Sequence, residues 1–156
     1  MHPASDNGHG QRQGNGCPFH QVLVAWDGSP DSVMALRTAI AIITGTRGRV
    51  VAFTVLAPAP PHEDRQDETS EAARRAQDSF DAARDNLGTS SPPVRLETAE
   101  SRHVPKSLCE FASDHAFDLL VLGRHGQGGI LHPKLGHIAQ ETARLARVPV
   151  LLVSAH

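Results

Sequence analysis

The sequence has almost no net charge and no long apolar run, and each shortage excludes a class of protein. Its 15 lysines and arginines nearly balance 17 aspartates and glutamates, so bulk electrostatics would recruit neither nucleic acid nor an anionic membrane. No apolar run approaches the about 20 residues that span a bilayer. The first 16 residues also lack the hydrophobic core of a signal peptide. We therefore expect a soluble, cytoplasmic protein without nucleic-acid or membrane partners.

Cysteines are also scarce. Cys17 and Cys109 lie far apart in the chain without a Cys-x-x-Cys pair, which indicates cytosolic thiols. The histidines near the N-terminus show no regular metal-ligand spacing. Residues 1–17 contain almost nothing to bury and predict a disordered tail, so we expect one folded domain over residues 18–156.

Two widespread nucleotide-binding motifs are missing as well. The chain has no GxxxxGKS/T sequence, so a P-loop is absent. No GxGxxG follows the first predicted strand, so the dinucleotide fingerprint is absent too. What remains for a nucleotide is a glycine-rich stretch much later in the chain.

The chain does contain an alternation of buried-strand and amphipathic-helix patterns. Apolar or alternating runs predict strands over residues 20–26, 49–56, 94–99, 117–122 and 148–153. Helical periodicity predicts helices that begin at Pro30, near residue 70, at Val104 and at Gly136. The connection over residues 57–69 is long and polar and is expected to be mobile. This order predicts a flavodoxin-like α/β sandwich with a five-stranded parallel sheet and four helices.

Two loops are expected to meet at the ligand site of this sandwich. In doubly wound sheets a ligand binds beyond the carboxyl ends of the strands, where the strand order reverses. The loop at residues 27–29 follows the first strand, and the loop at residues 123–136 follows the fourth. The second loop carries Gly123, Gly126 and Gly136 between a buried strand and a helix start. Backbone N–H groups in such a loop, together with a helix N-terminus, favour an anionic ligand.

Residues 20–154 resemble the universal stress protein family. The resemblance rests on the early VLVAWDGS, on Gly123, Gly126 and Gly136 at the spacing Gly-2x-Gly-9x-Gly, and on the closing RVPVLLV. It implies an adenine nucleotide alpha hydrolase-like sandwich that works as a stress-response sensor or regulator. It also implies binding of ATP with Mg²⁺, with AMP and cyclic AMP as alternatives.

The resemblance further implies which residues hold the nucleotide. Asp27 would hold the ribose or adenine side, and Ala25 and Val55 would face the adenine. The loop glycines would let the backbone approach the ribose and phosphates, and the start of the last helix would present N–H groups. The implied nucleotide-binding residues are Ala25, Asp27, Val55, Gly123, Arg124, Gly126, Gln127, Gly128, Gly129, Gly136, His137 and Ile138.

Two residues depart from the family pattern. In the ATP-binding branch of the resembled family, the residue after the last glycine is a Ser or Thr, whose hydroxyl is expected to bind a phosphate. Here that residue is His137. A neutral imidazole donates only one N–H, whereas a protonated one would pair well with phosphate. His103 stands where the family usually has Gly, and its side chain would narrow the site or cap the third helix.

Several of these residues also have a purely structural interpretation. Asp27 can cap a turn or a helix start, and Val55 can belong to the core. Arg124 and Lys134 can neutralise phosphate or be ordinary surface charges. Trp26 is expected to pack at the end of its strand rather than to stack on a base.

The loop histidines are the candidates for a metal site. His125, His132 and His137 have no carboxylate or cysteine partner nearby in the sequence, so we predict no metal site.

The sequence offers no convincing catalytic base, so we predict a nucleotide-binding sensor and not an enzyme. Two rivals stay open: a nucleotide-free dimeric interaction module of the same fold, and an ATP-consuming enzyme whose site is not recognisable.

The final predicted strand indicates a homodimer. Residues 148–153 are apolar and close the chain, and an unpaired apolar edge strand promotes association. Members of the resembled family pair through this strand. We therefore expect a homodimer through the C-terminal strand.

Overall fold

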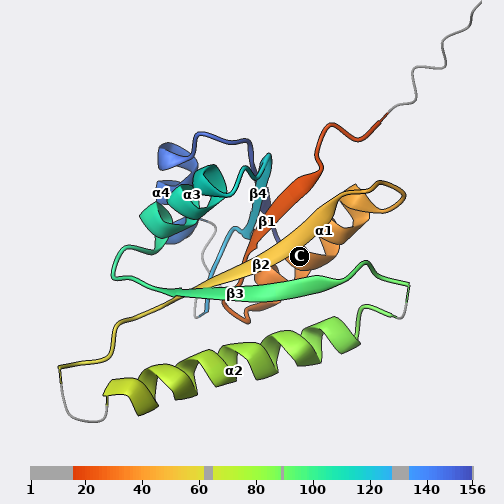
Figure 1. Ribbon diagram of the computed structural model, residues 1–156. Coiled ribbons are helices and arrows are strands. Elements are labelled where there is room, and N and C mark those ends of the chain that lie inside the picture. The colour runs from red at the N-terminus through yellow and green to blue at the C-terminus, as the bar shows by residue number, and fades with distance from the viewer. Residues whose placement is uncertain (1–15, 62–64, 89, 128–133, 156) are drawn as a thin grey trace, which may run out of the picture.

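The computed structural model describes residues 16–61, 65–88, 90–127 and 134–155, in which strands and helices alternate (Figure 1). The strands are β1 (Gln21–Ala25), β2 (Arg49–Leu56), β3 (Val94–Glu100), β4 (Leu119–Gly123) and β5 (Val150–Val153). The helices are α1 (Pro30–Ile43), α2 (Arg65–Asp85), α3 (Val104–Asp114) and α4 (His137–Leu145). Nearly all of the predicted tail, residues 1–17, lies outside the described residues, so its disorder stays a prediction.

The strands form one parallel sheet in the order β3-β2-β1-β4-β5. In β1, Val22 lies opposite Val50 of β2 on one side and Leu119 of β4 on the other. The strand order therefore reverses at β1, and the loops that follow β1 and β4 become neighbours. The predicted sandwich with a five-stranded parallel sheet is confirmed, as is the position of β3 at an edge.

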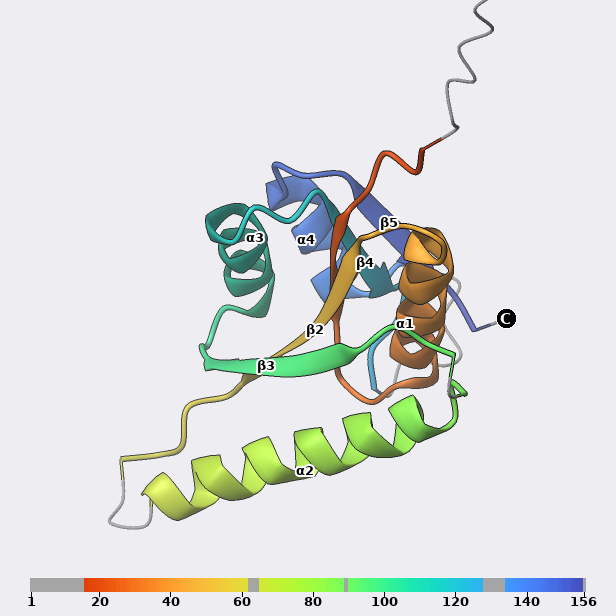
Figure 2. The same cartoon turned by 45° about the vertical axis from the view of Figure 1, so that its right-hand side comes forward.

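Helices cover both faces of the sheet, which explains why the central strands are apolar along their whole length. In two views, α3 and α4 lie together on one side of the sheet and α1 on the other (Figures 1 and 2). Alternate residues of β1 enter different layers. Val22 and Val24 pack with α1, whereas Leu23 packs with α3 and α4, and all three are fully buried.

Local sequence signals set both ends of α1. Ser29 is the N-cap, and its Oγ accepts the Ser32 N–H at 3.2 Å. Pro30 occupies the first helical position, where its fixed φ suits the helix and its missing N–H is no loss. The helix ends at Ile43, just before Gly45, whose φ of +80° is a left-handed conformation that glycine adopts without strain.

α2 begins earlier than the sequence pattern predicts. Residues 65–69, which belong to the connection expected to be mobile, are helical. They are polar and charged, so no apolar stripe marks them as helix. Asp67 and Glu68 lie in the first turn, where negative charge stabilises a helix N-terminus. Residues 62–64 of the same connection lie outside the described residues.

Phe80 anchors α2 to the rest of the domain. It is fully buried, and its ring meets that of Trp26 edge-on at a centroid distance of 5.6 Å. Trp26 is itself only 3% exposed and packs at the strand end as predicted, and it also lines a cavity at the ends of the strands. That it does not stack on a base stays a prediction. In the part of the chain that the structure describes, no helix is long and apolar enough to cross a bilayer.

Candidate functional site

A cavity of about 650 Å³ lies at the carboxyl ends of β1, β2 and β4. Residues that follow β1 and β4, and the start of α4, contribute to its wall, as the strand order requires. The predicted residues that line it are Ala25, Asp27, Val55, Gly123, Arg124, Gly126, Gln127, Gly136, His137 and Ile138. The two other predicted residues, Gly128 and Gly129, lie outside the described residues. The structure thus brings the ten described candidates together around one space.

Part of the cavity wall is apolar, and most of that part was not predicted. The additional apolar lining residues are Trp26, Phe53, Val104, Leu108, Leu122, Leu135 and Ala139. They come from β2, α3, β4, α4 and the residues next to β1 and α4, and all except Trp26 belong to or pack on the core layer beneath α3 and α4. The sequence marks such positions as buried, but it cannot separate a core residue from a residue that faces a cavity. Val55 shows both properties, because it is half-buried, packs on this layer and lines the cavity.

Each of the three loop glycines has a close neighbour inside the protein. A Cβ on Gly123 would lie 2.5 Å from the Cβ of Asp31, and one on Gly136 would lie 2.9 Å from the carbonyl oxygen of Arg124. A Cβ on Gly126 would lie 3.0 Å from Oδ2 of Asp27. The spacing predicts glycines that let a ligand approach, whereas the structure gives each of them a close protein neighbour. The approach of a ligand stays a prediction.

Asp27 connects the two loops. Its Oδ1 accepts the Ser29 N–H at 2.9 Å, so the capping interpretation of this residue is correct. Its backbone carbonyl accepts a hydrogen bond from Nε2 of Gln127 at 2.6 Å. Oδ2 faces Gly126, and among the described residues no hydrogen bond reaches this oxygen. Asp27 can therefore cap its turn and still offer one carboxylate oxygen to a ligand hydroxyl.

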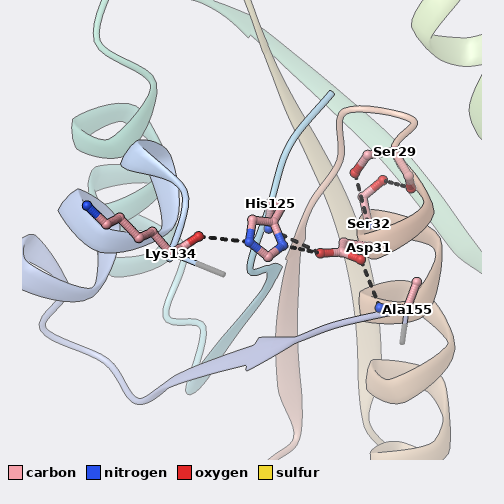
Figure 3. Close-up of polar contacts among 6 residues, drawn as sticks. All are labelled: Ser29, Asp31, Ser32, His125, Lys134 and Ala155. Carbon is pink, nitrogen blue, oxygen red and sulfur yellow. Dashed lines mark hydrogen bonds and ion pairs between the residues drawn. The ribbon is translucent and has the colours of Figure 1, made fainter. Parts of the chain in front are cut away.

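Asp31 is a residue that the sequence does not single out. It lies in the first turn of α1 and is only 7% exposed (Figure 3). Its Oδ1 accepts the N–H of Ala155, beyond β5, at 2.8 Å, and its Oδ2 accepts the N–H of His125 at 3.1 Å. Burial raises the pKa of Asp31, but the hydrogen bonds from Ala155 and His125 together outweigh burial and leave the pKa below its ordinary value. An acidic residue in a first turn is the one signal that could have marked it.

His125 holds both of its ring nitrogens in contacts with the protein. Nδ1 lies 3.3 Å from Oδ2 of Asp31, and Nε2 lies 2.8 Å from the carbonyl oxygen of Lys134 (Figure 3). Its side chain is 18% exposed. Within the described ranges, no three His, Cys, Asp or Glu side chains gather where they could hold a metal ion. His132 lies outside those ranges.

The start of α4 presents backbone N–H groups and positive charge. Gly136 occupies the N-cap position, and no side chain caps this helix end. His137 is the first helical residue, is exposed and lines the cavity. Arg124 and Lys134 are exposed, line the same cavity and form no ion pair with the described residues. Backbone donors and cations that gather in this way favour an anionic ligand.

His103 takes neither of the roles expected for it. It stands at the N-cap position of α3, but its side chain makes no capping hydrogen bond. It is exposed and is not among the residues that line the cavity. The His103 side chain therefore neither caps α3 nor narrows the cavity, and Pro105 in the first turn helps to start the helix.

Comparison with known proteins places the fold in one family. A sequence model described as the universal stress protein family matches residues 18–154. The universal stress protein UspA from Lactobacillus plantarum superposes with a TM-score of 0.72 at 22% identity, covering 86% of this chain and 97% of that one. A universal stress protein in complex with cAMP has a TM-score of 0.60 at 26% identity, with coverage of 88% and 98%. A family protein from Arabidopsis thaliana with AMP bound has a TM-score of 0.58 at 11% identity, with coverage of 86% and 91%. No curated protein matches the sequence.

Proposed function

The chain belongs to the universal stress protein family, and on that premise we propose that it binds an adenine nucleotide in the cavity at the carboxyl ends of the strands. One observation carries the proposal: the ten described candidate residues line a single cavity. The nucleotide is ATP, and the protein acts as a cytoplasmic sensor or regulator in a stress response. A structural neighbour at 26% identity is in complex with cAMP, and another has AMP bound, which supports the preference for adenine.

The lining supplies a suitable environment for each part of the nucleotide. The apolar wall, with Phe53, Val55 and Leu108, suits the faces of a purine ring. The second carboxylate oxygen of Asp27 suits a ribose hydroxyl, because a carboxylate accepts hydrogen bonds from such donors. The uncapped N-terminus of α4, with His137 beside it, suits the phosphates.

The charge around the cavity favours ATP over AMP and cyclic AMP. Arg124 and Lys134 are exposed at the cavity, and His137 adds a third positive charge when it is protonated. A triphosphate offers more negative charge to these groups than a monophosphate or a cyclic phosphate does. Mg²⁺ would enter with the phosphates, since it is usually held by phosphate oxygens and water. We assign no residue of this chain to the ion.

The proposal makes this chain a binding protein and not an enzyme. Asp31 and His125 contact each other and backbone groups, so neither is placed to act on a bound nucleotide. Among the residues that the structure describes, Asp27 is the one carboxylate with an oxygen available at the cavity. Slow hydrolysis of ATP would be incidental. Turnover that Asp27→Asn abolishes while ATP still binds would instead indicate an enzyme.

A nucleotide-free interaction module is the second candidate function. The observation in its favour is that Gly123, Gly126 and Gly136 each have a close neighbour within the protein. Gly123 and Gly136 are therefore needed by the fold whether or not a ligand binds, because their neighbours are a Cβ and a backbone carbonyl that cannot move aside easily. His137 also replaces the hydroxyl of the ATP-binding branch.

A homodimer through β5 completes the proposal. Among the described strands, β5 lies at an edge and pairs with β4 alone, and its residues are all partly buried. An edge of this kind is open to pairing with a second copy. We expect a dimeric mass by light scattering at micromolar concentration, and a monomeric mass would contradict this part of the proposal.

Calorimetric titration with ATP and Mg²⁺ tests the function. We expect saturable binding that Gly126→Val weakens at least about tenfold, because a branched side chain there would displace the Asp27 carboxylate. The matched control is Ala82→Val on the exposed face of α2, which should bind like the wild type. AMP and cyclic AMP are titrated in parallel to rank the nucleotides. No binding at millimolar ATP by a folded protein would favour the interaction module.

A further inference from the structure

Thr54, near the carboxyl end of β2, carries a hydroxyl that has no partner in the described part of the fold. The residue is only 7% exposed. Within the residues that the structure describes, its side chain makes no hydrogen bond. A buried polar group without a partner costs free energy, so each such group in a folded protein requires an explanation.

The other buried polar side chains differ from Thr54. Oγ of Ser29 accepts the Ser32 N–H at 3.2 Å, and Oγ of Ser32 donates to the Ser29 carbonyl at 2.8 Å (Figure 3). The carboxylate of Asp31 accepts two backbone N–H groups. Among the described residues, the hydroxyl of Thr142 is the one side-chain polar atom that is completely enclosed without a partner. The hydroxyl of Thr54 is therefore not enclosed, and it reaches open space.

The open space beside Thr54 is the cavity at the carboxyl ends of the strands, because Thr54 and its neighbour Val55 both line it. Phe53 and Val55 pack on the layer of α3 and α4, so the side chain between them takes the opposite side of the strand. Trp26 packs on that opposite side, and its backbone N–H donates to the carbonyl of Phe53 at 2.9 Å. Thr54 therefore borders the cavity beside the loop that begins with Asp27.

Thr54 and Asp27 offer complementary hydrogen-bonding groups to a sugar. Among the described residues, no hydrogen bond reaches Oδ2 of Asp27, and a carboxylate oxygen can only accept. A threonine hydroxyl can donate and accept. Ribose presents two neighbouring hydroxyls that also donate and accept, so one can donate to the carboxylate while the other pairs with threonine. Phosphate oxygens do not suit this part of the wall, because the charge of Asp27 repels them.

We propose that Thr54 is a specificity-determining residue that forms a hydrogen bond with a ribose hydroxyl of the bound nucleotide, beside Asp27. The inference rests on the proposed function and deepens it, because it assigns a contact to the sugar. The bound ribose supplies the partner that the described part of the fold does not. The site therefore favours nucleotides with an intact ribose over analogues that lack its hydroxyls.

Variants at Thr54 isolate the hydroxyl from the shape of the side chain. Thr54→Val removes the hydroxyl and keeps a β-branched side chain that suits a strand. We expect it to weaken ATP binding about fivefold, the loss of roughly one hydrogen bond. Thr54→Ser keeps a hydroxyl and should bind ATP nearly as well as the wild type.

Thr98→Val is the matched control. Thr98 lies opposite Thr54 in the neighbouring strand β3, but it is exposed and is not among the residues that line the cavity. The same substitution is therefore made in the same sheet without a change at the cavity. We expect Thr98→Val to bind ATP like the wild type.

Urea denaturation without nucleotide distinguishes a ligand contact from a structural one. Loss of a hydroxyl that the fold does not use should leave the urea midpoint of Thr54→Val unchanged or raise it, because an apolar group replaces an unpaired polar group. A midpoint clearly below that of Thr98→Val would show that the hydroxyl supports the fold, and it would overturn the proposal. This measurement does not depend on whether the protein binds a nucleotide.

The closing experiment measures, by calorimetry, the affinity of the wild type and of Thr54→Val for ATP and for dideoxy-ATP, which lacks both ribose hydroxyls. We expect the loss of about fivefold with ATP and no loss with dideoxy-ATP, because that analogue has no hydroxyl to pair with Thr54. Equal losses with both ligands would overturn the proposal, as would equal ATP binding by the two proteins. In either case the proposed function stands, because the wild type binds ATP. A wild type that binds no ATP would instead overturn the proposed function, and this inference with it.

Discussion

The loop after β1 and the loop after β4 reach the same cavity, but they are held in different ways. In the first loop, Asp27 caps the Ser29 N–H, which lies two positions away in the chain. In the second loop, Asp31 binds His125 across 94 positions, and Asp27 binds Gln127 across 100. The carboxylate of Asp27 in the first loop is thus held by a near neighbour, whereas the second loop is held by residues that only the assembled sheet brings close.

This difference predicts how each loop responds to substitution. Contacts between near neighbours can form together with β1 and α1, because they need little more than the local chain. Contacts across the sheet form only when β1, β4 and β5 are paired, so their loss affects the position of several segments at once. We therefore expect long-range contacts to have the larger effect on stability and local contacts the smaller one.

Removal of the Asp31 carboxylate should have the largest effect. Asp31→Ala leaves the backbone N–H groups of Ala155 and His125 without their acceptor and removes the contact with Nδ1 of His125. A hydrogen bond to a charged group contributes about 1.5–3 kcal/mol, so we expect the free energy of unfolding to fall by about 3 kcal/mol. Urea denaturation measures the change. Asp85→Ala, at the exposed end of α2, is the control, and a loss of similar size there would contradict the prediction.

Gly123 and Gly126 should differ although both belong to the same motif. A Cβ on Gly123 would collide with the Cβ of Asp31 at 2.5 Å, which cannot move without α1, so Gly123→Ala should cost about 2 kcal/mol. A Cβ on Gly126 would meet the end of the Asp27 side chain at 3.0 Å, which can rotate away. We expect Gly126→Ala to cost less than half as much in the same urea experiment. Equal losses would show that α1 can shift.

Removal of the local cap should have a smaller effect. Ser29→Ala removes the oxygen that accepts the Ser32 N–H, and loss of an N-cap costs about 1 kcal/mol. Ser29→Asp should recover most of that loss, because aspartate is an equally good cap. Thermal unfolding of both variants is the measurement, with Ser113→Ala on the exposed face of α3 as the control. A loss as large as that of Asp31→Ala would remove the distinction between the two loops.

The pH dependence of stability should show the smallest effect. Burial raises the pKa of Asp31, but the hydrogen bonds from Ala155 and His125 outweigh it, so the folded-state pKa lies below the ordinary value of 3.8. A depressed pKa stabilises the fold above the unfolded-state pKa, and this contribution is lost as the pH falls through the folded-state pKa. Between about pH 5 and pH 2, Asp31→Asn should therefore lose less stability than the wild type. Parallel acid-denaturation curves for the two proteins would contradict this.

The sequence predicts the fold well because its signals act over short distances. The apolar run of β1, the cap at Ser29 and the proline at Pro30 each fix local structure, and all three agree with the structure. Residues 65–69 were not predicted to be helical because they lack such a local signal: this charged first turn of α2 has no apolar stripe. The glycine spacing also identified a loop that lines the cavity, although close protein contacts account for Gly123 and Gly136.

The candidate site is predicted only in part. Alternating strands and helices require that loops after β1 and β4 meet, so Asp27 and Gly126 could be placed together in advance. The apolar lining of the cavity could not be predicted, because a buried residue such as Leu108 has the same sequence pattern in a solid core as beside a cavity. The contacts of His125 with Asp31 and Lys134 could not be predicted either, since nothing in a single sequence pairs two particular residues across the sheet.

By itself, the sequence determined the order of strands and helices, the ends of α1 and the loop that carries the glycines, because capping, periodicity and turns depend on residues a few positions apart. Only the tertiary structure decided that Asp31 joins His125 and Ala155, which lies 124 positions away. That contact exists because the order β3-β2-β1-β4-β5 places the ends of β1, β4 and β5 side by side. Parallel pairing of distant strands turns three separate segments into one site.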